Sequence, residues 1–304
     1  MSNAVARFLD SDIAYSFRGS PVAMLCAATV LLCLFAAAFA PWISPHNPFD
    51  LASLSLLDSF KPPAMAPDGE WAYPLGTDDQ GRDVLSGILY GTRISLTVGI
   101  CSVALAMGIG VTIGLASGYL GGIVDATLMR IADIQLTFPA ILIALLIDGI
   151  ARVALPKDLR EAMEIYVLIF AIGISSWPQF ARIVRGSTLV ERGKDYVLAA
   201  RIIGIAPLKI VLSHILPNVI GPVLVIATLN LGFAILAEAT LSFLGIGLPP
   251  TQPSLGTLIR IGNAFLFSGE WWMTIFPGAA LVIMVLSINL LGDWLRDALN
   301  PRLR

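Results

Sequence analysis

Residues 94–120 read ISLTVGICSVALAMGIGVTIGLASGYL, and this run contains no charged side chain. A helix needs about 20 mostly apolar residues to cross the hydrocarbon core of a bilayer, so the run is long enough to span one. Five further runs have a similar character, at residues 21–43, 126–147, 165–181, 219–244 and 273–292. The sequence therefore predicts an all-α membrane protein with about six transmembrane helices.

The composition of the whole chain agrees with a lipid environment. Its 304 residues are 57% hydrophobic and 13% charged, whereas soluble domains carry about 25% charged residues. With a net charge of −2, the chain lacks the excess of basic residues that is typical of nucleic-acid-binding proteins. The three cysteines lie inside apolar runs, without the spacing of a metal site or a disulfide framework. The bilayer is thus the first partner that the sequence predicts.

The first run, residues 21–43, has one feature of a secretory signal, because Ala38-Phe39-Ala40 has the small-residue pattern of a cleavage site. However, the run is longer than a signal core of about 7–15 residues. Pro41 would also follow the cut bond, where proline fits badly. We therefore expect a retained membrane span.

The third run, residues 126–147, differs from the others because it contains Arg130 and Asp133. These two residues are three positions apart on one helical face, where opposite charges can pair and reduce the cost of entering lipid. The same run contains Phe138-Pro139, which predicts a kink because proline cannot donate the backbone hydrogen bond of a helix interior.

The Lys and Arg residues set the expected orientation. With six spans, twelve of the 19 basic residues fall on the side of the two termini and seven on the other side. Basic residues concentrate on the cytoplasmic side, so we expect both termini in the cytoplasm. The expected segments are a cytoplasmic start at residues 1–20, an external loop at 44–93 with a short helix at 83–90, and a core at 94–304 that includes a cytoplasmic loop at 182–217.

The cytoplasmic loop contains the most informative stretch, residues 195–217, which read DYVLAARIIGIAPLKIVLSHILP and are called the elbow below. Asp195 is expected to cap a short helix, and Gly204 suits the left-handed residue that follows such a helix. Pro207 suits the first turn of a second short helix, which Leu216-Pro217 is expected to end.

The first short helix is expected to meet a partner. Ala199 and Ala200 give it a bare flank that a groove on another protein could approach closely. The alternative is an amphipathic hairpin that lies on the membrane surface, with its arginines following the positive-inside rule.

The elbow resembles the cytoplasmic coupling loop of ABC-importer permeases. That pattern is Glu-Ala-Ala, three residues, Gly, nine residues, Ile, one residue and Leu-Pro. Ala199, Ala200, Gly204, Leu216 and Pro217 match it at the right spacing. Leu198 replaces the glutamate and His214 replaces the isoleucine, which argues against a salt bridge at position 198. The resemblance implies that Asp195, Tyr196 and Arg201 belong to the same ATPase-coupling surface.

Three further blocks are similar to the second, C-type permease subunit of dipeptide, oligopeptide and nickel importers: GTDDQGRDV at 76–84, LSFLGIG at 241–247 and GDWLRDALNP at 292–301. The resemblance implies a type I ABC importer fold in a bacterial inner membrane. It implies a second permease that completes the pore, one or two cytoplasmic ATPases and an external substrate-binding protein. The implied solutes are di- or oligopeptides or related small molecules.

The chain itself lacks the Gly-x-x-x-x-Gly-Lys-Ser/Thr loop that cradles nucleotide phosphates. We therefore expect no catalytic residue, metal or cofactor in this chain, with ATP and Mg²⁺ bound by the partner ATPases. Two other functions would leave different signals in the sequence. A carrier or channel working alone would show buried carboxylates or two similar halves, and a membrane enzyme would show a catalytic pair at membrane depth.

Two groups of polar residues are further candidates. Asp78, Asp79, Arg82 and Asp83, called the external cluster below, form either a docking surface or gate for the binding protein, or a solvated loop held by local ion pairs. Asn230 and Glu238 lie in the fifth run. Asn230 is either an interhelical hydrogen-bond partner or a substrate ligand, and Glu238 has either a pore role or a structural hydrogen bond.

Gly110, Gly114 and Gly118 recur at four-residue spacing in the second run. This stripe of small residues predicts close packing against another helix.

Overall fold

A computed structural model of the chain describes residues 12–48, 54–248 and 252–299, and these segments form helices and connecting loops without a β-strand. The long helices are α3 (Pro21–Ile43), α4 (Val84–Leu120), α7 (Lys157–Glu191), α10 (Leu216–Phe243) and α12 (Trp272–Ala298). The shorter helices are α2 (Asp12–Arg18), α5 (Gly122–Leu136), α6 (Ala140–Ala154), α8 (Asp195–Ile202), α9 (Pro207–Ile210) and α11 (Leu255–Asn263).

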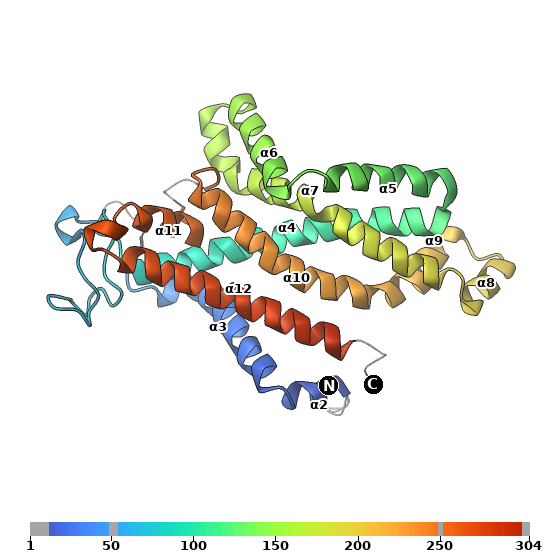
Figure 1. The fold of residues 1–304 in the computed structure, drawn as a ribbon, viewed down its shortest axis with the longest axis horizontal. Coiled ribbons are helices and arrows are strands. Elements are labelled where there is room, and N and C mark those ends of the chain that lie inside the picture. Colours follow the sequence, from blue (N-terminus) through green and yellow to red (C-terminus); the bar gives the residue numbers. More distant parts are fainter. Residues whose placement is uncertain (1–11, 49–53, 249–251, 300–304) are drawn as a thin grey trace.

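The helices α4, α7, α10 and α12 run along the longest axis of the molecule (Figure 1). The loop before α4 and the helix α11 lie at one end of this bundle, and α8 and α9 lie at the other. α6 and the beginning of α7 project sideways, and α3 diverges from the bundle (Figure 1). Near α3, Phe17 of α2 packs edge-on against Trp294 of α12 at 5.1 Å between ring centroids.

The glycine stripe of α4 packs directly against α7. A β-carbon at Gly110 would come within 2.4 Å of Phe180, one at Gly114 within 2.6 Å of the Ala181 carbonyl, and one at Gly118 within 2.7 Å of Thr188. Real β-carbons do not approach other atoms this closely, so only glycine permits the observed spacing. The predicted close packing is confirmed, and it makes α4 and α7 the central pair of the bundle.

The third predicted span, residues 126–147, is not one helix. α5 and α6 meet at an 88° bend. Within the described residues, five helices are long and apolar enough to cross a membrane, or six if this bent pair counts as one span. Pro139 lies at the break, before the first residue of α6. The expected pairing of Arg130 with Asp133 is also wrong, because Asp133 pairs with Arg182 of α7.

A second proline explains how the bend is held in place. Pro178 lies inside α7, where its nitrogen cannot donate to the carbonyl of Ile174. Gln135, near the end of α5, donates its side-chain amide to that carbonyl. Trp177 Nε1 donates in turn to Gln135 Oε1 at 2.8 Å. The Gln135 side chain at the end of α5 therefore accepts one hydrogen bond from α7 and donates another to it, next to Pro178.

Two helix boundaries also differ from the sequence prediction. The short helix expected at 83–90 is the beginning of α4, which Asp83 caps by accepting from the Ser86 amide at 2.8 Å. The fourth span, expected at 165–181, belongs to the longer α7. Charge-free windows find the part of a helix inside lipid and miss the charged turns at its ends.

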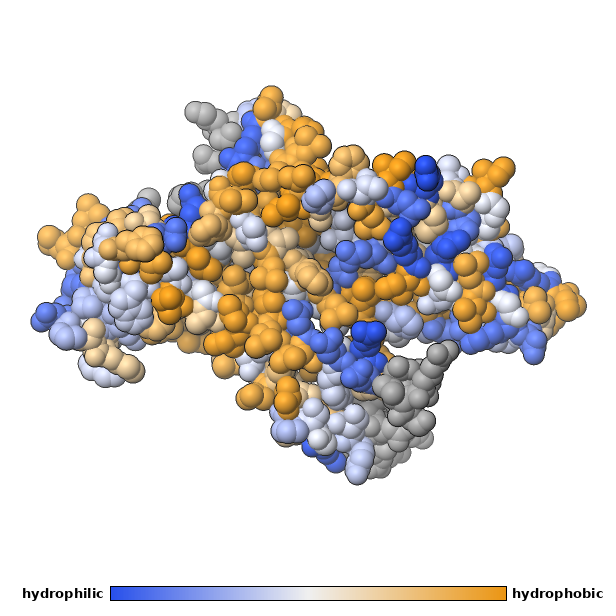
Figure 2. Space-filling view, viewed as in Figure 1, coloured by the Kyte–Doolittle hydropathy of each residue, from blue (hydrophilic) through white to orange (hydrophobic). Residues whose placement is uncertain are grey.

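The surface of the bundle is largely apolar. Figure 2 shows hydrophobic residues across the middle of the molecule and hydrophilic residues gathered toward the end that carries α8 and α9. Val282 and Ile283 of α12 are more than half exposed in this band. Such a surface requires lipid or another apolar chain as its cover. The cytoplasmic location of the termini stays a prediction from the charge distribution.

Candidate functional site: the elbow and two polar clusters

The elbow is a helix, a left-handed glycine and a second helix, as predicted. Gly204 has φ +82° and follows α8. Its amide donates to the Arg201 carbonyl at 3.0 Å, and the Ile205 amide donates to the Ala200 carbonyl at 3.1 Å. These two bonds are the Schellman pattern that ends helices at glycine. In the described part of the chain, no atom beyond its chain neighbours lies within 4 Å of a β-carbon built at Gly204, so the backbone conformation is what requires glycine there.

The two ends of the elbow differ from the prediction. Lys194 occupies the N-cap position of α8, where its side chain does not cap the helix, and Asp195 is the first helical residue. Its carboxylate still lies near the positive end of the helix dipole. At the other end, Leu216 and Pro217 do not stop the helix, because Pro207–Phe243 forms one helical span.

A wide turn at Val211–Ile215 lets the helix pass through Pro217. The Leu216 amide donates to the Val211 carbonyl, five residues back, which is the π-helical pattern. Pro217 cannot donate to the Ser213 carbonyl, and its ring would collide with that carbonyl in a regular α-helix. The widened turn accommodates the proline, so the second arm of the elbow is the beginning of the α10 span itself.

One face of the elbow is anchored in the core. Val197, Ala200, Ile210 and Ile215 are buried in the cluster that α4, α7 and α10 share. Ala200 therefore faces inward, which corrects the expectation that both alanines form the bare flank. Ala199 is exposed. The physical reason is helical geometry, since two adjacent residues point about 100° apart.

The other face of the elbow carries large apolar side chains in the open. Leu198 is 43% exposed, Ile202 86%, Ile203 77% and Leu208 70%. Asp195 and Arg201 are exposed beside them. A cluster of exposed apolar residues with a polar rim at the hydrophilic end of the molecule has the character of a protein-binding surface.

Tyr196 connects the elbow to two spans. Its hydroxyl donates to Glu191 at the end of α7 at 2.5 Å and accepts from Asn218 of α10 at 3.1 Å. Lys194 also contacts Glu191, with 2.6 Å between Nζ and Oε1. Burial and the neighbouring Glu191 carboxylate raise the pKa of Tyr196, so its hydroxyl keeps the proton that it donates.

Arginines make two further connections between the elbow region and the bundle. The Arg201 guanidinium lies over the ring of Tyr119 of α4, 4.9 Å from its centroid. Arg192 donates to the Gly118 carbonyl at 2.8 Å, where α4 is about to end. α8 and its flanking residues therefore contact the ends of α4, α7 and α10 together.

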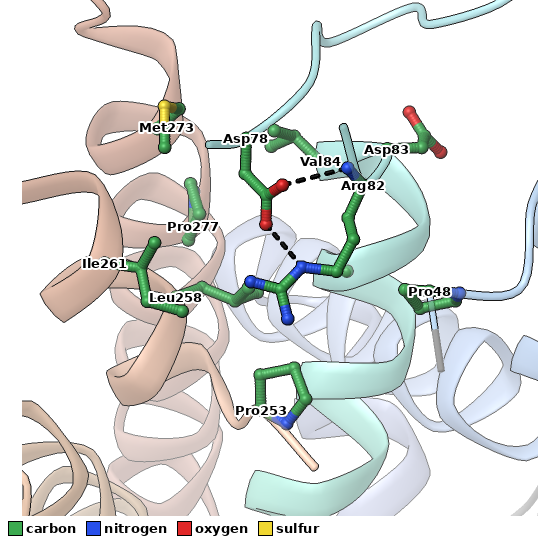
Figure 3. Close-up of a pocket in the computed structure, with 11 residues that line it drawn as sticks. Pro48, Asp78, Arg82, Asp83, Val84, Pro253, Leu258, Ile261, Met273 and Pro277 are labelled. Atoms are coloured by element: carbon green, nitrogen blue, oxygen red, sulfur yellow. Dashed lines mark hydrogen bonds and ion pairs between the residues drawn. The ribbon is translucent and has the colours of Figure 1, made fainter. Parts of the chain in front are cut away.

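Three of the four residues of the external cluster are buried. Asp78 accepts from the Arg82 amide at 2.9 Å and from Arg82 Nε at 2.6 Å, and both side chains are buried. Figure 3 shows the Arg82 side chain reaching toward Leu258 of α11 and toward Pro253. Asp83 is buried as the cap of α4. These three residues fix the loop rather than present charges to a partner.

Asp79 is the accessible member of the external cluster. It is half-buried, and its carboxylate lies 3.9 Å from Arg82 Nη2. Partial burial raises the pKa of Asp79, and the neighbouring Asp78 carboxylate raises it further. A contact that the sequence did not reveal also holds this loop, because Trp272 Nε1 donates to the Thr77 carbonyl at 3.1 Å.

Glu238 is fully buried and surrounded by hydroxyl groups. Ser95 of α4 and Ser242 of α10 each donate to it at 2.7 Å. The carboxyl group thus joins α4 to α10, which is a structural role rather than a pore role. Asn230, also buried, donates to the Ile226 carbonyl of its own helix at 3.0 Å and borders a hollow.

The family model described as the inner membrane component of binding-protein-dependent transport systems matches residues 110–304. The chain belongs to this family. A second match, to the N-terminal transmembrane domain of oligopeptide transport permease C, covers residues 11–63 of the permease.

Curated relatives match the permease over nearly its whole length. It is 38% identical to the dipeptide transport system permease protein DppC of Haemophilus influenzae over 290 residues, 95% of this chain and 94% of that protein. It is 37% identical to the oligopeptide transport system permease protein OppC of Bacillus subtilis over 293 residues, 96% of this chain and 90% of that protein. The C-type resemblance drawn from the sequence motifs is thereby confirmed.

A solved structure matches the fold. An inward-facing form of the MetNI methionine ABC transporter aligns with a TM-score of 0.52 and 22% identity, over 71% of the permease and 96% of the matched chain. The predicted all-α importer fold is confirmed. The permease is a multi-pass inner-membrane subunit of an ABC importer, and its family consists of transport subunits rather than enzymes.

Several residues of the site escaped sequence reasoning. Glu191, Asn218, Gln135 and Ser95 act through partners that lie 5 to 143 positions away along the chain. Their only sequence signal is a polar side chain inside or next to an apolar run. Such a signal predicts that a partner exists but does not identify it.

Proposed function

We propose that the permease carries di- or oligopeptides, or related small solutes, through a pathway that it forms with a second permease. An external binding protein delivers the solute. One or two cytoplasmic ATPase subunits bind ATP and Mg²⁺ and drive the cycle through the elbow. The observation that carries this proposal is the elbow itself, in which the turn at Gly204 joins the partly exposed helix α8 to the continuous helical span Pro207–Phe243.

The elbow has the connections that a mechanical coupling requires. A displacement of α8 acts on α7 through Tyr196 and Glu191, and on α4 through Arg201 and Tyr119. It reaches α10 directly, because the turn at Gly204 leads into a continuous helix. A partner changes the conformational equilibrium only by its differential affinity for two states, so the ATPases must hold α8 differently in each state.

The external cluster fits a supporting role in the same proposal. The buried Asp78–Arg82 pair (Figure 3) and the Asp83 cap hold the loop in place beside α11 and α12. A rigid loop offers the binding protein a defined surface, in which Asp79 is the charged group of the cluster within reach. Asn230 faces the solute pathway in this proposal, whereas Glu238 joins helices.

Reconstitution tests the transport function. The permease is co-expressed with the second permease, the ATPases and the binding protein of its own system, and the complex is placed in proteoliposomes. We expect ATP-dependent uptake of labelled trialanine that requires the binding protein. Uptake by the permease alone, or without ATP, would instead indicate a stand-alone carrier.

Cross-linking tests the elbow separately. A cysteine in place of Ile202, the most exposed apolar residue of α8, should cross-link to an ATPase subunit in the assembled complex. Reaction with a probe dissolved in the acyl chains would place the elbow on the membrane surface instead, and would contradict the coupling proposal.

A further inference from the structure

A hollow of about 250 Å³ lies between α6, α7 and α10. It is found where α6 leaves the bundle (Figure 1). Most of its wall is apolar, and Phe233 of α10 is 66% exposed beside it. Four polar side chains also line it: Ser175, Ser176 and Gln179 of α7, and Asn230 of α10. The hollow with this lining is called the polar hollow below.

The hydrogen bonds already made in the polar hollow leave mainly acceptors available. Ser175 donates to the Ala171 carbonyl at 2.6 Å, and Ser176 donates to the Ile172 carbonyl at 3.1 Å. Asn230 uses its amide nitrogen on the Ile226 carbonyl. Each of these side chains retains an oxygen that can accept a bond. Gln179 is exposed and forms no hydrogen bond with the described part of the chain.

The position of Gln179 shows that lipid does not cover the hollow. Gln179 lies near the middle of the span Met163–Glu191, and Asn230 lies near the middle of α10. An exposed amide without a hydrogen bond is costly in hydrocarbon. The hollow must therefore face water, a solute or polar groups of another chain.

The polar hollow continues along α10 toward the elbow. A second hollow lies next to it, lined by Asn218, Pro222 and Ile226 of α10, Ile183 of α7 and Arg296 of α12. Residues 222, 226, 230, 233 and 237 border the two hollows and recur every three or four positions, so they share one helix face. One strip of α10 thus borders both hollows, from mid-span to the beginning of the helix.

We propose that the polar hollow is a solute-contact site in the transport pathway and that it accepts hydrogen bonds from the N–H groups of a passing peptide. This inference rests on the proposed peptide transport. Three oxygen acceptors and one free amide match the backbone of a peptide, which offers an N–H at each residue and a protonated amino terminus. Among the described residues that line the polar hollow, none is charged, so the site reads the peptide backbone and tolerates different peptide side chains.

Thiol labelling of the assembled complex tests this site. Cys26, Cys33 and Cys101 are first replaced by serine. Gln179→Cys and Phe233→Cys then probe the polar hollow, and Ile283→Cys on the exposed face of α12 serves as the matched control. The reagent is a charged thiosulfonate. It is added to proteoliposomes with ATP and the binding protein, with and without trialanine.

We expect residues 179 and 233 to react about tenfold faster than residue 283, because lipid excludes a charged reagent. We also expect trialanine to slow labelling at 179 and 233 but not at 283. Equal, slow reaction at all three positions overturns the proposal, because the hollow is then covered. Fast reaction that trialanine leaves unchanged also overturns it, because the solute then makes no contact there.

Uptake of labelled trialanine, measured with the cysteine-free complex, separates the two proposals. Uptake without protection at residue 179 contradicts the contact site and leaves peptide transport standing. Absence of uptake contradicts the proposed substrate class, and the reactivity of residue 179 still decides whether the hollow faces water.

Discussion

Gly204 is the elbow residue whose backbone conformation excludes other residue types. Its φ of +82° lies in the left-handed region, and the turn it forms points the chain from α8 into α9. A β-branched residue in this region is strained, at a cost of about 1–2 kcal/mol. The turn at Gly204 therefore sets the angle between α8 and the helical span that contains α10.

We predict that Gly204→Val uncouples ATP hydrolysis from transport. The strained turn should open and change the position of α8, so uptake should fall about tenfold while the ATPases keep hydrolysing, since about 1.4 kcal/mol corresponds to tenfold. Uptake and phosphate release are measured on the same proteoliposomes. Gly193→Val is the matched control, because Gly193 lies just before α8 without a positive φ. Normal uptake in Gly204→Val would contradict the coupling role.

Tyr196 permits a second substitution that removes a single oxygen. We predict that Tyr196→Phe lowers the amount of peptide transported per ATP, because the hydroxyl between Glu191 and Asn218 is lost. A hydrogen bond to a charged group contributes about 1.5–3 kcal/mol, so the unfolding temperature in detergent should also fall. Tyr166→Phe is the control, since Tyr166 is 66% exposed. Identical behaviour of the two variants would show that the hydrogen bonds of the Tyr196 hydroxyl contribute neither to coupling nor to stability.

Among the helices, the contact between α5 and α7 has the clearest physical logic. Pro178 leaves the Ile174 carbonyl without its helical donor, and Gln135 supplies the replacement from another helix. Trp177 then fixes the orientation of the Gln135 side chain. The end of α5, just before the bend, and the proline site of α7 are therefore held by the same pair of hydrogen bonds.

A double-mutant cycle can measure this contact. We predict that Gln135→Leu lowers the free energy of unfolding by about 1–3 kcal/mol, because a carbonyl and an indole N–H lose their partner. Pro178→Ala restores the backbone donor inside α7, so the double variant should recover most of the part owed to the carbonyl. The measurement is thermal or denaturant unfolding in detergent. Purely additive effects of the two substitutions would contradict the predicted exchange of donors.

The features that the sequence could predict are those that depend on residues close together in the chain. The charge-free runs located the spans, and Gly204 revealed its turn, because each effect depends on a few neighbouring residues. Pro139 signalled a distortion, but the size of the bend depends on Gln135 meeting α7. Pro217 was expected to end a helix, and a wide turn absorbs it instead.

The external cluster shows the same limit for the candidate site. The sequence placed Asp78, Arg82 and Asp83 together, but their burial depends on the packing of α11 and α12 over the loop. A charged motif does not reveal whether it faces solvent or closes a structural contact. Likewise, Ala200 fits the family pattern, yet it faces the core of its own chain.

At the scale of the whole molecule, the two ends differ in what they expose. The elbow end exposes Ile202 and Ile203, and Figure 2 shows hydrophilic residues gathered toward this end. The opposite end presents Leu57, which is 93% exposed, in the loop before α4 (Figure 1). Between them lies the apolar belt that lipid or the second permease must cover. This arrangement predicts that separate partners bind at separate ends and can be removed independently.

We predict that the double substitution Ile202→Ser and Ile203→Ser releases the ATPases and leaves the second permease bound. Both side chains are more than three-quarters exposed, so the fold of the chain should tolerate the change, while an apolar contact with an ATPase groove is lost. Leu57→Ser is the matched control at the far end and should retain the ATPases. The complex is purified in mild detergent through a tag on the permease, and its subunits are identified by mass. Retention of the ATPases by the double variant, or recovery of an active homo-oligomer without them, would refute the assignment of the elbow as their binding site.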